Sequence, residues 1–470
     1  MRYLPLLVCL LGGSAAAASI SSSVPNDDLP DLTRDQLRQA KSQPKLNSGD
    51  SGKQAPVSMT SQELLQQPDL LQNALNTAVS QQNIDNIRFL LPLYRQLPQQ
   101  DPILAEYAET LLLRSDGHYT EAQRRLQALV DSHPDYAPIR LQLAVTLAQD
   151  GQTKEAAKEV KTIRQSPDLP PPVAAYVGQF DQALKNSQKW NVSGNAYYLQ
   201  DNNVGRAPEQ RTYGAWQFSE PRSAHGIGYE LYAQKNTPIK GHWALRTQTS
   251  AYGKFYWDAH DYDDVTARVE AGPVWHNHQQ EIAVMPFYEK RWFATDPYSY
   301  TTGGSLRYSR TLSPKWQLFG TWQSGYKKHN DRTYLNGASH NGAVSLFYRT
   351  SPQQSFVFGL GGGYTSAKDH SEAYSSRDIR VGWSRDWQSL NNLSTNINTS
   401  IQQRYYQAPD IFNIKRHDTE YSTRVSVSHP KLSWHGFTPR LNWTWSHISS
   451  NHFYYRFNQN KVFFDITKQF

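Results

Sequence analysis

The chain has 470 residues, of which 38% are hydrophobic, 12% aromatic and 19% charged. Its 48 basic and 41 acidic residues give a net charge of +7, which is too dilute for a nucleic-acid-binding surface. The single cysteine excludes an intramolecular disulfide framework and any zinc or iron–sulfur site built from several cysteines. The aromatic content is too high for a disordered chain, so the composition indicates folded domains.

The N-terminal segment, residues 1–18, has the pattern of a secretory signal peptide. Arg2 supplies a positive charge, residues 4–10 form an apolar run, and small residues follow up to Ala18. We therefore expect cleavage between Ala18 and Ser19. The apolar run is far shorter than the ~20 residues of a membrane-spanning helix. Cys9 lies inside this run, too early for a lipid-attachment site, and is expected to be removed with the signal peptide.

Two regions follow the signal peptide, and they differ in periodicity. Residues 19–60 are rich in Ser, Asp, Gln, Pro and Lys and have no apolar period, so we expect a disordered linker. Residues 61–186 carry apolar side chains at helical spacing. Within them the heptapeptide at 116–122 recurs at 150–156, and the offset of 34 residues is the period of tetratricopeptide repeats.

This offset predicts a helical solenoid. We expect full repeats over 103–136 and 137–168, a degenerate repeat before them and a capping helix over 172–186. An Asp-Gly pair ends the first helix of each repeat, because glycine tolerates positive φ, and a small alanine lets the second helix pack closely. The residues expected to set this packing are Gly117, Ala122, Gly151 and Ala156. Thr120 and Thr153 are expected to start the second helices.

Stacked helix pairs form a concave groove that commonly binds protein or peptide. A rigid spacer is the alternative interpretation of this region, and a catalytic role is disfavoured.

Residues 187–470 change to a period of two and are rich in Tyr, Trp, Phe, Thr, Ser and Gly. Alternating segments of this kind, with an apolar face for lipid and a polar face for a lumen, are typical of transmembrane β-barrels. Only a closed barrel satisfies every backbone group of a strand in lipid. Candidate segments number about thirteen to fifteen, and bacterial barrels use even numbers, so we predict fourteen strands. A soluble β-sandwich or propeller is the alternative, although soluble strands are shorter.

The last segment supports the barrel interpretation most directly. Phe464, Ile466 and Phe470 share one face and end the printed sequence with an aromatic residue, which is the assembly signal of bacterial outer-membrane barrels. Lys468 on the same face departs from an apolar pattern, but a long side chain can extend its charge to the membrane surface.

Several motifs carry a resemblance to a known family. They are 201–204 (DNNV), 223–226 (SAHG), 256–257 (YW), 286–292 (PFYEKRW), 436–441 (GFTPRL), 450–452 (SNH) and 461–464 (KVFF). With the predicted domain order, they make residues 60–470 resemble the Slam family, the surface lipoprotein assembly modulators of Gram-negative bacteria. The family's Asn-Val-Asn turn reads Asn203-Val204-Gly205 here, so a role for its second Asn is in doubt.

The resemblance implies export rather than catalysis. Slam proteins are outer-membrane translocons that move lipoproteins, or related haem-binding proteins, from periplasm to cell surface. The resemblance therefore implies an outer-membrane barrel in contact with lipid, a helical domain in the periplasm that holds the client, and cooperation with the barrel assembly machinery and periplasmic chaperones. No cofactor and no nucleic-acid partner are expected.

Other interpretations remain open at this stage. A polysaccharide exporter has the same order of helical repeats and barrel, and a porin or nutrient receptor would need only the barrel. His276 and His278 are expected to form a polar turn rather than a metal site, and the aspartates between 258 and 264 a solvated loop rather than a calcium site, because the EF-hand pattern is missing. No nucleotide-binding, dinucleotide-binding or G-x-S-x-G motif supports an enzyme.

Overall fold

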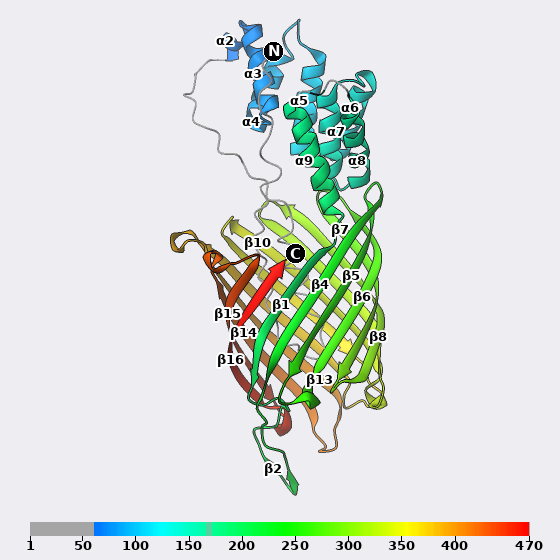
Figure 1. Ribbon diagram of the computed structural model, residues 1–470, viewed down its shortest axis with the longest axis vertical. Coiled ribbons are helices and arrows are strands. Elements are labelled where there is room, and N and C mark those ends of the chain that lie inside the picture. The colour runs from blue at the N-terminus through cyan, green and yellow to red at the C-terminus, as the bar shows by residue number, and fades with distance from the viewer. Residues whose placement is uncertain (1–60, 167–168, 170, 470) are drawn as a thin grey trace.

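The computed structural model describes residues 61–166, 169 and 171–469. The signal peptide and linker expected before residue 61, with Cys9, Ala18 and Ser19, lie outside this range, as does Phe470. The described chain forms a helical domain that stands on one end of a tall β-barrel (Figure 1). Within these ranges, no helix is both long enough and apolar enough to cross a membrane.

Eight described helices build the helical domain. They are α2 (Ser61–Leu65), α3 (Pro68–Ser80), α4 (Ile84–Tyr94), α5 (Pro102–Ser115), α6 (Tyr119–Ser132), α7 (Ala137–Gln149), α8 (Thr153–Arg164) and α9 (Pro171–Ser187). Helices α5–α6 and α7–α8 are the two helix pairs that the 34-residue offset predicts, so the repeat fold is confirmed. Two apolar clusters form the core, one within α2–α5 and one shared by α6–α9.

The turn inside each repeat depends on its glycine. Gly117 has φ +86° and Gly151 has φ +84°, a backbone conformation that side chains with a Cβ rarely adopt. Ala122 and Ala156, five residues further on, are fully buried between helices.

The expectation that Thr120 and Thr153 start the second helices holds for Thr153 and is one residue off for Thr120. Helix α6 begins one residue before Thr120, and helix α8 begins with Thr153 itself. The capping positions belong to His118 and Gln152, and neither side chain bonds the first helical turn. The second helices therefore depend on packing of their apolar faces rather than on a cap.

Fourteen strands close into one antiparallel barrel in the order β1-β16-β15-β14-β13-β12-β11-β10-β9-β8-β7-β6-β5-β4. The number confirms the prediction. The strands are β1 (Asn191–Asp201), β4 (Ala224–Lys240), β5 (Trp243–Tyr256), β6 (Asp264–His276), β7 (Gln280–Phe293), β8 (Asp296–Ser313), β9 (Trp316–His329), β10 (Gly337–Ser351), β11 (Gln354–Thr365), β12 (Tyr374–Trp387), β13 (Leu393–Pro409), β14 (Lys415–Ser428), β15 (Phe437–Ser450) and β16 (Phe457–Gln469).

The two ends of the barrel differ in their connections. Four turns at the end under the helical domain have only two or three residues, at 241–242, 277–279, 314–315 and 352–353. The far end carries the long β1–β4 loop, 202–223, in which β2 (Thr212–Tyr213) and β3 (Trp216–Gln217) form a small separate sheet that projects outward (Figure 1). Most short turns thus lie at one end, although the two-residue turn 294–295 is at the far end and the connection 429–436 is under the helical domain. A prevalence of short turns at one end and of longer loops at the other is typical of outer-membrane barrels.

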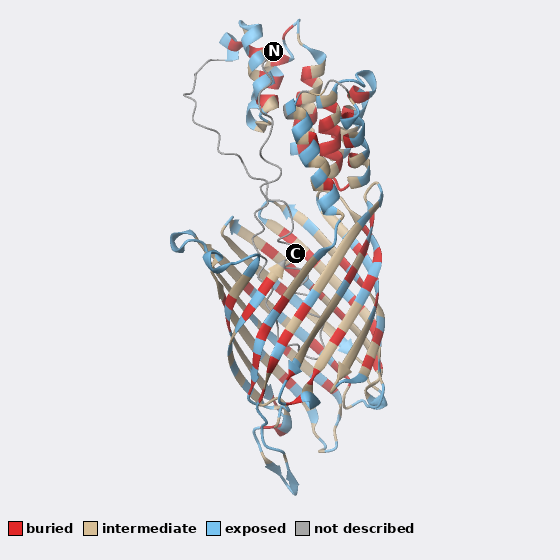
Figure 2. Cartoon of the chain, in the orientation of Figure 1, coloured by how far each residue is buried: buried red, intermediate tan, exposed pale blue. Residues whose placement is uncertain are grey.

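Along the strands, exposed and buried residues alternate (Figure 2). The outward residues include exposed large apolar side chains, such as Val344, Leu360, Ile379, Val462 and Phe464. The inward residues include buried polar side chains, such as Gln248, Glu270, Asn341, Asn442 and Asp465. An apolar outer face and a polar lumen are the arrangement that a lipid bilayer requires.

Candidate functional site

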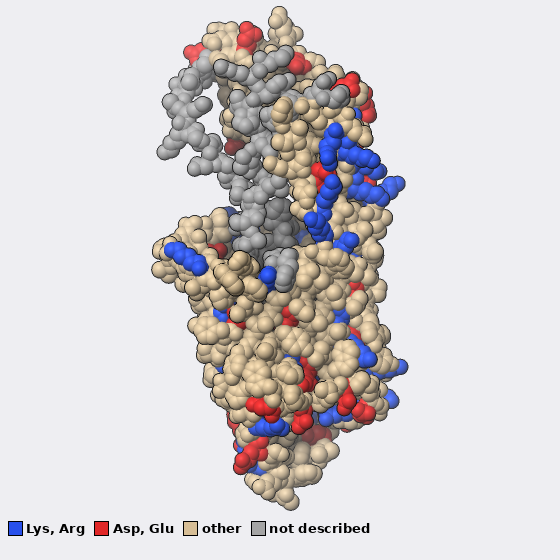
Figure 3. Space-filling view, viewed as in Figure 1, with Lys and Arg blue, Asp and Glu red and all other residues tan. Residues whose placement is uncertain are grey.

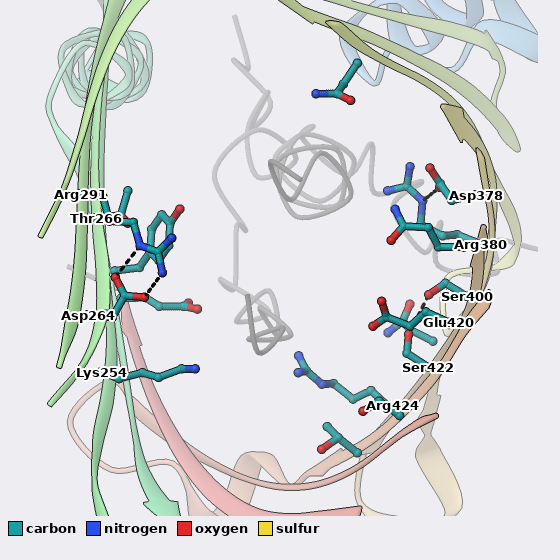
Figure 4. Close-up of a pocket in the computed structure, with 18 of the residues that line it drawn as sticks. Lys254, Asp264, Thr266, Arg291, Asp378, Arg380, Ser400, Glu420, Ser422 and Arg424 are labelled. Carbon is teal, nitrogen blue, oxygen red and sulfur yellow. Dashed lines mark hydrogen bonds and ion pairs between the residues drawn. The ribbon is translucent and has the colours of Figure 1, made fainter. Parts of the chain in front are cut away.

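The barrel lumen contains a cavity of about 840 Å³. Among the described side chains that line it, seven are acidic and ten are basic, and most of the rest are small or polar. Figure 4 shows charged and polar side chains that project into this space from opposite walls. The lumen therefore presents charge of both signs rather than a dense field of one sign.

Ion pairs hold many of these charges against the wall. On one side, the Arg291 guanidinium donates to both carboxylate oxygens of Asp264 at 2.9 and 2.7 Å. Deeper in the same wall, Glu270 accepts from Arg307 at 2.5 Å and from Arg268 at 3.3 Å. Arg268 lies two residues before Glu270 on β6, whereas Arg307 reaches it from β8 across the intervening β7, so one buried carboxylate connects β6 and β8 in a shared polar network.

The opposite wall has the same character. Arg380 lies 2.7 Å from the Asp378 carboxylate on β12, and Arg404 of β13 donates to Glu420 of β14 at 3.2 Å. Ser400 and Ser422 lie on the same wall (Figure 4) and are joined by a hydroxyl hydrogen bond of 2.7 Å. Walls of paired charges and hydroxyls stay hydrated and offer many weak contacts. They suit the passage of a polar polymer better than tight binding of one ion.

A second candidate site lies where the helical domain meets the barrel. Asp150, at the turn between α7 and α8, is nearly buried there. Its carboxylate lies 2.8 Å from His278 Nδ1 and accepts from the Gln123 amide at 2.9 Å. Its backbone carbonyl lies 2.9 Å from Nδ1 of His242, in the β4–β5 turn. One aspartate therefore connects two barrel turns to the helical repeats.

Neighbouring contacts extend this junction. The Lys154 ammonium donates to the Ile239 carbonyl at 2.8 Å, and the Glu155 carboxylate accepts from the Gly241 amide at 3.0 Å. Tyr119 stacks on the His278 ring with centroids 4.2 Å apart, and burial raises the pKa of the Tyr119 hydroxyl. The helical domain is thus held on the barrel rim by hydrogen bonds, charge and an aromatic stack.

The structure places the four repeat residues singled out in the sequence in two settings. Ala122 and Ala156 lie inside the helical domain, whereas both glycines face the barrel. A Cβ at Gly151 would lie 2.5 Å from Nδ1 of His276, and one at Gly117 would lie 3.7 Å from the Gln279 amide. Close approach to the barrel is a role for these glycines that the repeat pattern alone does not reveal.

His276 and His278 thus lie at the junction. Among the described residues, no group of three or more His, Cys, Asp or Glu side chains is arranged to hold a metal ion. The aspartates of the β5–β6 loop have local partners: Asp263 accepts from the Tyr256 amide at 2.7 Å, and Asp258 accepts from the His225 amide at 2.7 Å. Hydrogen bonds from His225 lower the pKa of Asp258.

Of the terminal-strand residues, Phe464 and Ile466 point outward on β16, and Phe470 lies beyond the described range. Lys468 extends along the same surface, with its ammonium 4.4 Å from the Phe437 ring centroid. These positions fit a lipid-facing strand that ends in a charge near the membrane surface.

Several residues of the family motifs, whose role the sequence does not show, make polar contacts in the structure. Arg440, in the 436–441 motif, donates to both carboxylate oxygens of Asp465 on the neighbouring strand, and both side chains are almost fully buried. His452, in the 450–452 motif, lies 2.7 Å from the Asp410 carboxylate across two loops. Asn203 accepts from the Ala207 amide and donates to its carbonyl, both at 2.8 Å, and so folds the start of the β1–β4 loop. The cross-strand Arg440–Asp465 pair requires the strand register, which periodicity does not supply.

Comparison with known proteins gives the family. A model described as surface lipoprotein assembly modifier matches residues 190–470, and one described as the N-terminal TPR repeats of that family matches residues 57–160. The chain is 29% identical to surface lipoprotein assembly modifier 1 of Haemophilus influenzae, over 88% of this chain and 87% of that protein. It is 28% identical to surface lipoprotein assembly modifier 1 of Neisseria meningitidis serogroup B, over 100% of this chain and 96% of that protein.

A further relative, named hemophilin secretion modulator, comes from Acinetobacter baumannii and is 25% identical over 86% of both chains. The matches cover the helical repeats and the whole barrel in the order that the structure has them. This chain belongs to the surface lipoprotein assembly modifier family.

Proposed function

We propose that this chain is a translocon that exports a specific surface lipoprotein, or a related haem- or iron-binding protein, from the periplasm to the cell surface. The closed barrel and the family membership make it an outer-membrane protein. The family name supports a surface lipoprotein as client. The relative named hemophilin secretion modulator supports a haem-binding client as a second form of the same activity.

The observation that carries this proposal is the docking of the helical repeats on the barrel rim through Asp150, His242 and His278. Helical repeats of this type commonly bind peptides, and here they stand beside the mouth of a polar lumen. A client held there has a high effective concentration at the pore, because binding and entry become steps within one molecule. A free barrel would lack this advantage.

The two ends of the barrel support an orientation. Short turns in outer-membrane barrels face the periplasm, and four of the shortest turns lie under the helical domain. We therefore assign the helical domain to the periplasm and the β2–β3 loop to the cell exterior. In this orientation, periplasmic chaperones and the barrel assembly machinery are the expected partners.

The charge of the lumen separates this proposal from polysaccharide export. An exporter of a charged polysaccharide would benefit from a wall of one sign, whereas this lumen pairs Arg291 with Asp264 and Arg404 with Glu420. The outer surface agrees with a membrane protein, since the wall in Figure 3 shows fewer charged atoms than the helical domain and the far end. Paired charges fit a polypeptide, whose side chains carry both signs.

The test is deletion of the gene in its host, followed by mass spectrometry of peptides that protease releases from intact cells. We expect one or a few lipoproteins, or haem-binding proteins, to disappear from the surface and accumulate in the periplasm. Re-expression of the chain should restore them. An unchanged protein surface with altered surface polysaccharide would contradict the proposal.

A junction variant sharpens this test. His278→Ala removes one partner of the Asp150 carboxylate and the ring under Tyr119 without touching the lumen. We expect export to fall although the barrel still assembles, as its heat-dependent mobility in gels would show. Gly178→Ala is the matched control, because a Cβ at this position on α9 meets nothing within 4 Å. If added protease cleaved the helical domain from the barrel in the His278 variant and export were still normal, docking would be dispensable.

A further inference from the structure

The contact that closes the barrel, between its first and last strands, differs from every other strand contact. Strands β1 and β16 pair over five residues only, from Ser193 opposite Gln469 to Tyr197 opposite Asp465. On its other side, β1 pairs with β4 over eleven residues, up to Asp201. We call the contact between β1 and β16 the seam. Its ladder lies at the end near the helical domain, and within the described residues no backbone pairing joins the two strands beyond Tyr197.

Side chains alone span the outer half of the seam. Lys461 donates to the Asp201 carboxylate at 2.9 Å, and Gln459 donates to the same carboxylate at 3.4 Å. The Tyr197 and Phe463 rings lie 5.3 Å apart across the gap between the strands. Breaking such contacts costs less in a membrane than breaking a ladder of backbone hydrogen bonds, since lipid offers those backbone groups no other partner.

The loops on either side of the seam add an aromatic contact at the far end. Tyr213, in the β1–β4 loop, stacks on Phe453, in the β15–β16 loop, with ring centroids 4.1 Å apart. Phe218 of the first loop meets Tyr454 of the second edge-to-face at 5.4 Å. The outer half of the seam is therefore held by side-chain contacts between the strands and between the loops beyond them. Paired backbone is found only at the base of the seam, near the helical domain.

Below the Asp201–Lys461 pair, both faces of this outer half are apolar, unlike the rest of the lumen. On the inside, Tyr197 and Leu199 are buried in an apolar cluster to which Phe463 adds its ring. On the outside, Tyr198 and Phe464 are exposed on the lipid-facing surface. Elsewhere the lumen wall carries paired charges and hydroxyls. Apolar side chains therefore line this part of the seam on both its lumen side and its lipid side.

We propose that the outer half of the seam is the exit for the acyl chains of the client's lipid anchor. Acyl chains gain nothing from a charged lumen, and an apolar passage through the wall lets them reach lipid while the polypeptide leaves through the mouth. The ladder at the base keeps the wall closed at the periplasmic level, so the chains enter the outer leaflet. This inference rests on the proposed export of a lipoprotein and on the orientation given above.

The test locks the seam with a disulfide. In a Cys9→Ser background, Tyr198→Cys and Phe464→Cys replace outward residues that face each other when the register of the ladder is continued. The matched control is Ile227→Cys with Phe255→Cys, two exposed residues that are cross-strand partners on β4 and β5. Both variants are expressed in the deletion host, and display of the dependent surface lipoproteins is measured under oxidising and reducing conditions.

We expect the oxidised seam variant to lose display of lipidated clients to the level of the deletion strain, and a reductant to restore it. The same clients without their lipid-acceptor cysteine should still reach the exterior through the locked barrel. The control disulfide should leave both forms unaffected. Reversal by reductant separates a locked seam from a misassembled barrel.

Two results would overturn the inference. Normal display of lipidated clients by a fully cross-linked seam would exclude it and leave the translocon proposal intact. Equal loss of lipidated and unlipidated clients would show that the seam serves the polypeptide rather than the acyl chains. If gene deletion itself changed no surface protein, the translocon proposal would fail first.

Discussion

The helical domain and the barrel are built on opposite burial patterns. In the helical domain, Leu111 is 1% exposed at the centre of an apolar cluster. In the barrel, Leu360 is 63% exposed on the outer wall, whereas Asp465 is 0% exposed on the inner one. Both regions nevertheless remove their apolar side chains from water, the first by packing them together and the second by facing lipid.

This inversion shows which forces hold each region. Helix packing depends on filled apolar volume, so cavities should be costly there. The barrel depends on its backbone ladder and on polar side chains that satisfy each other across strands, so orphaned charges should be costly there. The same type of substitution should therefore have different effects in the two regions.

The largest effect is expected from breaking the Arg440–Asp465 pair. Asp465→Ala leaves a buried guanidinium without its carboxylate, and loss of one partner of a buried ion pair costs about 3–5 kcal/mol. The measurement is guanidinium unfolding of the full chain in lipid vesicles. The double variant, with Arg440→Leu added, should recover part of this loss because no orphaned charge remains. Equal stability of single variant and wild type would show that the pair is dispensable.

A leucine comparison should give the next largest effect. Leu111→Ala creates a cavity in the helical core and should cost about 2–5 kcal/mol in the helical domain, followed by circular dichroism during unfolding. Leu360→Ala on the lipid face should cost much less, because lipid fills the space. Leu360→Arg should instead cost about 2–4 kcal/mol in the barrel, since it places a charge in lipid. Similar costs for the two alanine variants would contradict the inverted burial pattern.

The smallest effect concerns the junction glycines. Gly151→Ala combines positive φ with a Cβ that would meet His276, so we expect about 1–2 kcal/mol of strain in the α7–α8 turn. Gly178→Ala, in the open α9, should stabilise the helical domain by about 0.4–1 kcal/mol. Faster proteolysis between the domains in the Gly151 variant would locate the strain at the rim. No difference between the two variants would mean that the turn relaxes freely.

The sequence predicts the repetition of elements well and their contacts poorly. The 34-residue offset locates α5–α8, and alternation locates most strands, because both are local periodicities. Several strands continue into polar residues beyond their lipid-facing part, as β4 does up to Lys240, so alternation alone does not give their ends. The projecting β2–β3 sheet was missed because it is too short to show a period.

The candidate site shows the same limit. The junction joins Asp150 to His278, 128 residues away, and the seam joins Asp201 to Lys461, 260 residues away. Such pairs are determined by the closure of the barrel and by the placement of one domain on another. A histidine in a turn and a glycine after an aspartate have ordinary local explanations. Their contacts at the junction can therefore be recognised only in the three-dimensional structure.

The junction also has a geometric consequence for how this architecture can vary. The Gly117 and Gly151 turns both approach the β6–β7 turn, Gly117 at Gln279 and Gly151 at His276. An added repeat between them would displace one turn from its partner, whereas a repeat added before α5 would leave both in place. Length changes in the helical array are therefore expected to accumulate at its distal, N-terminal end.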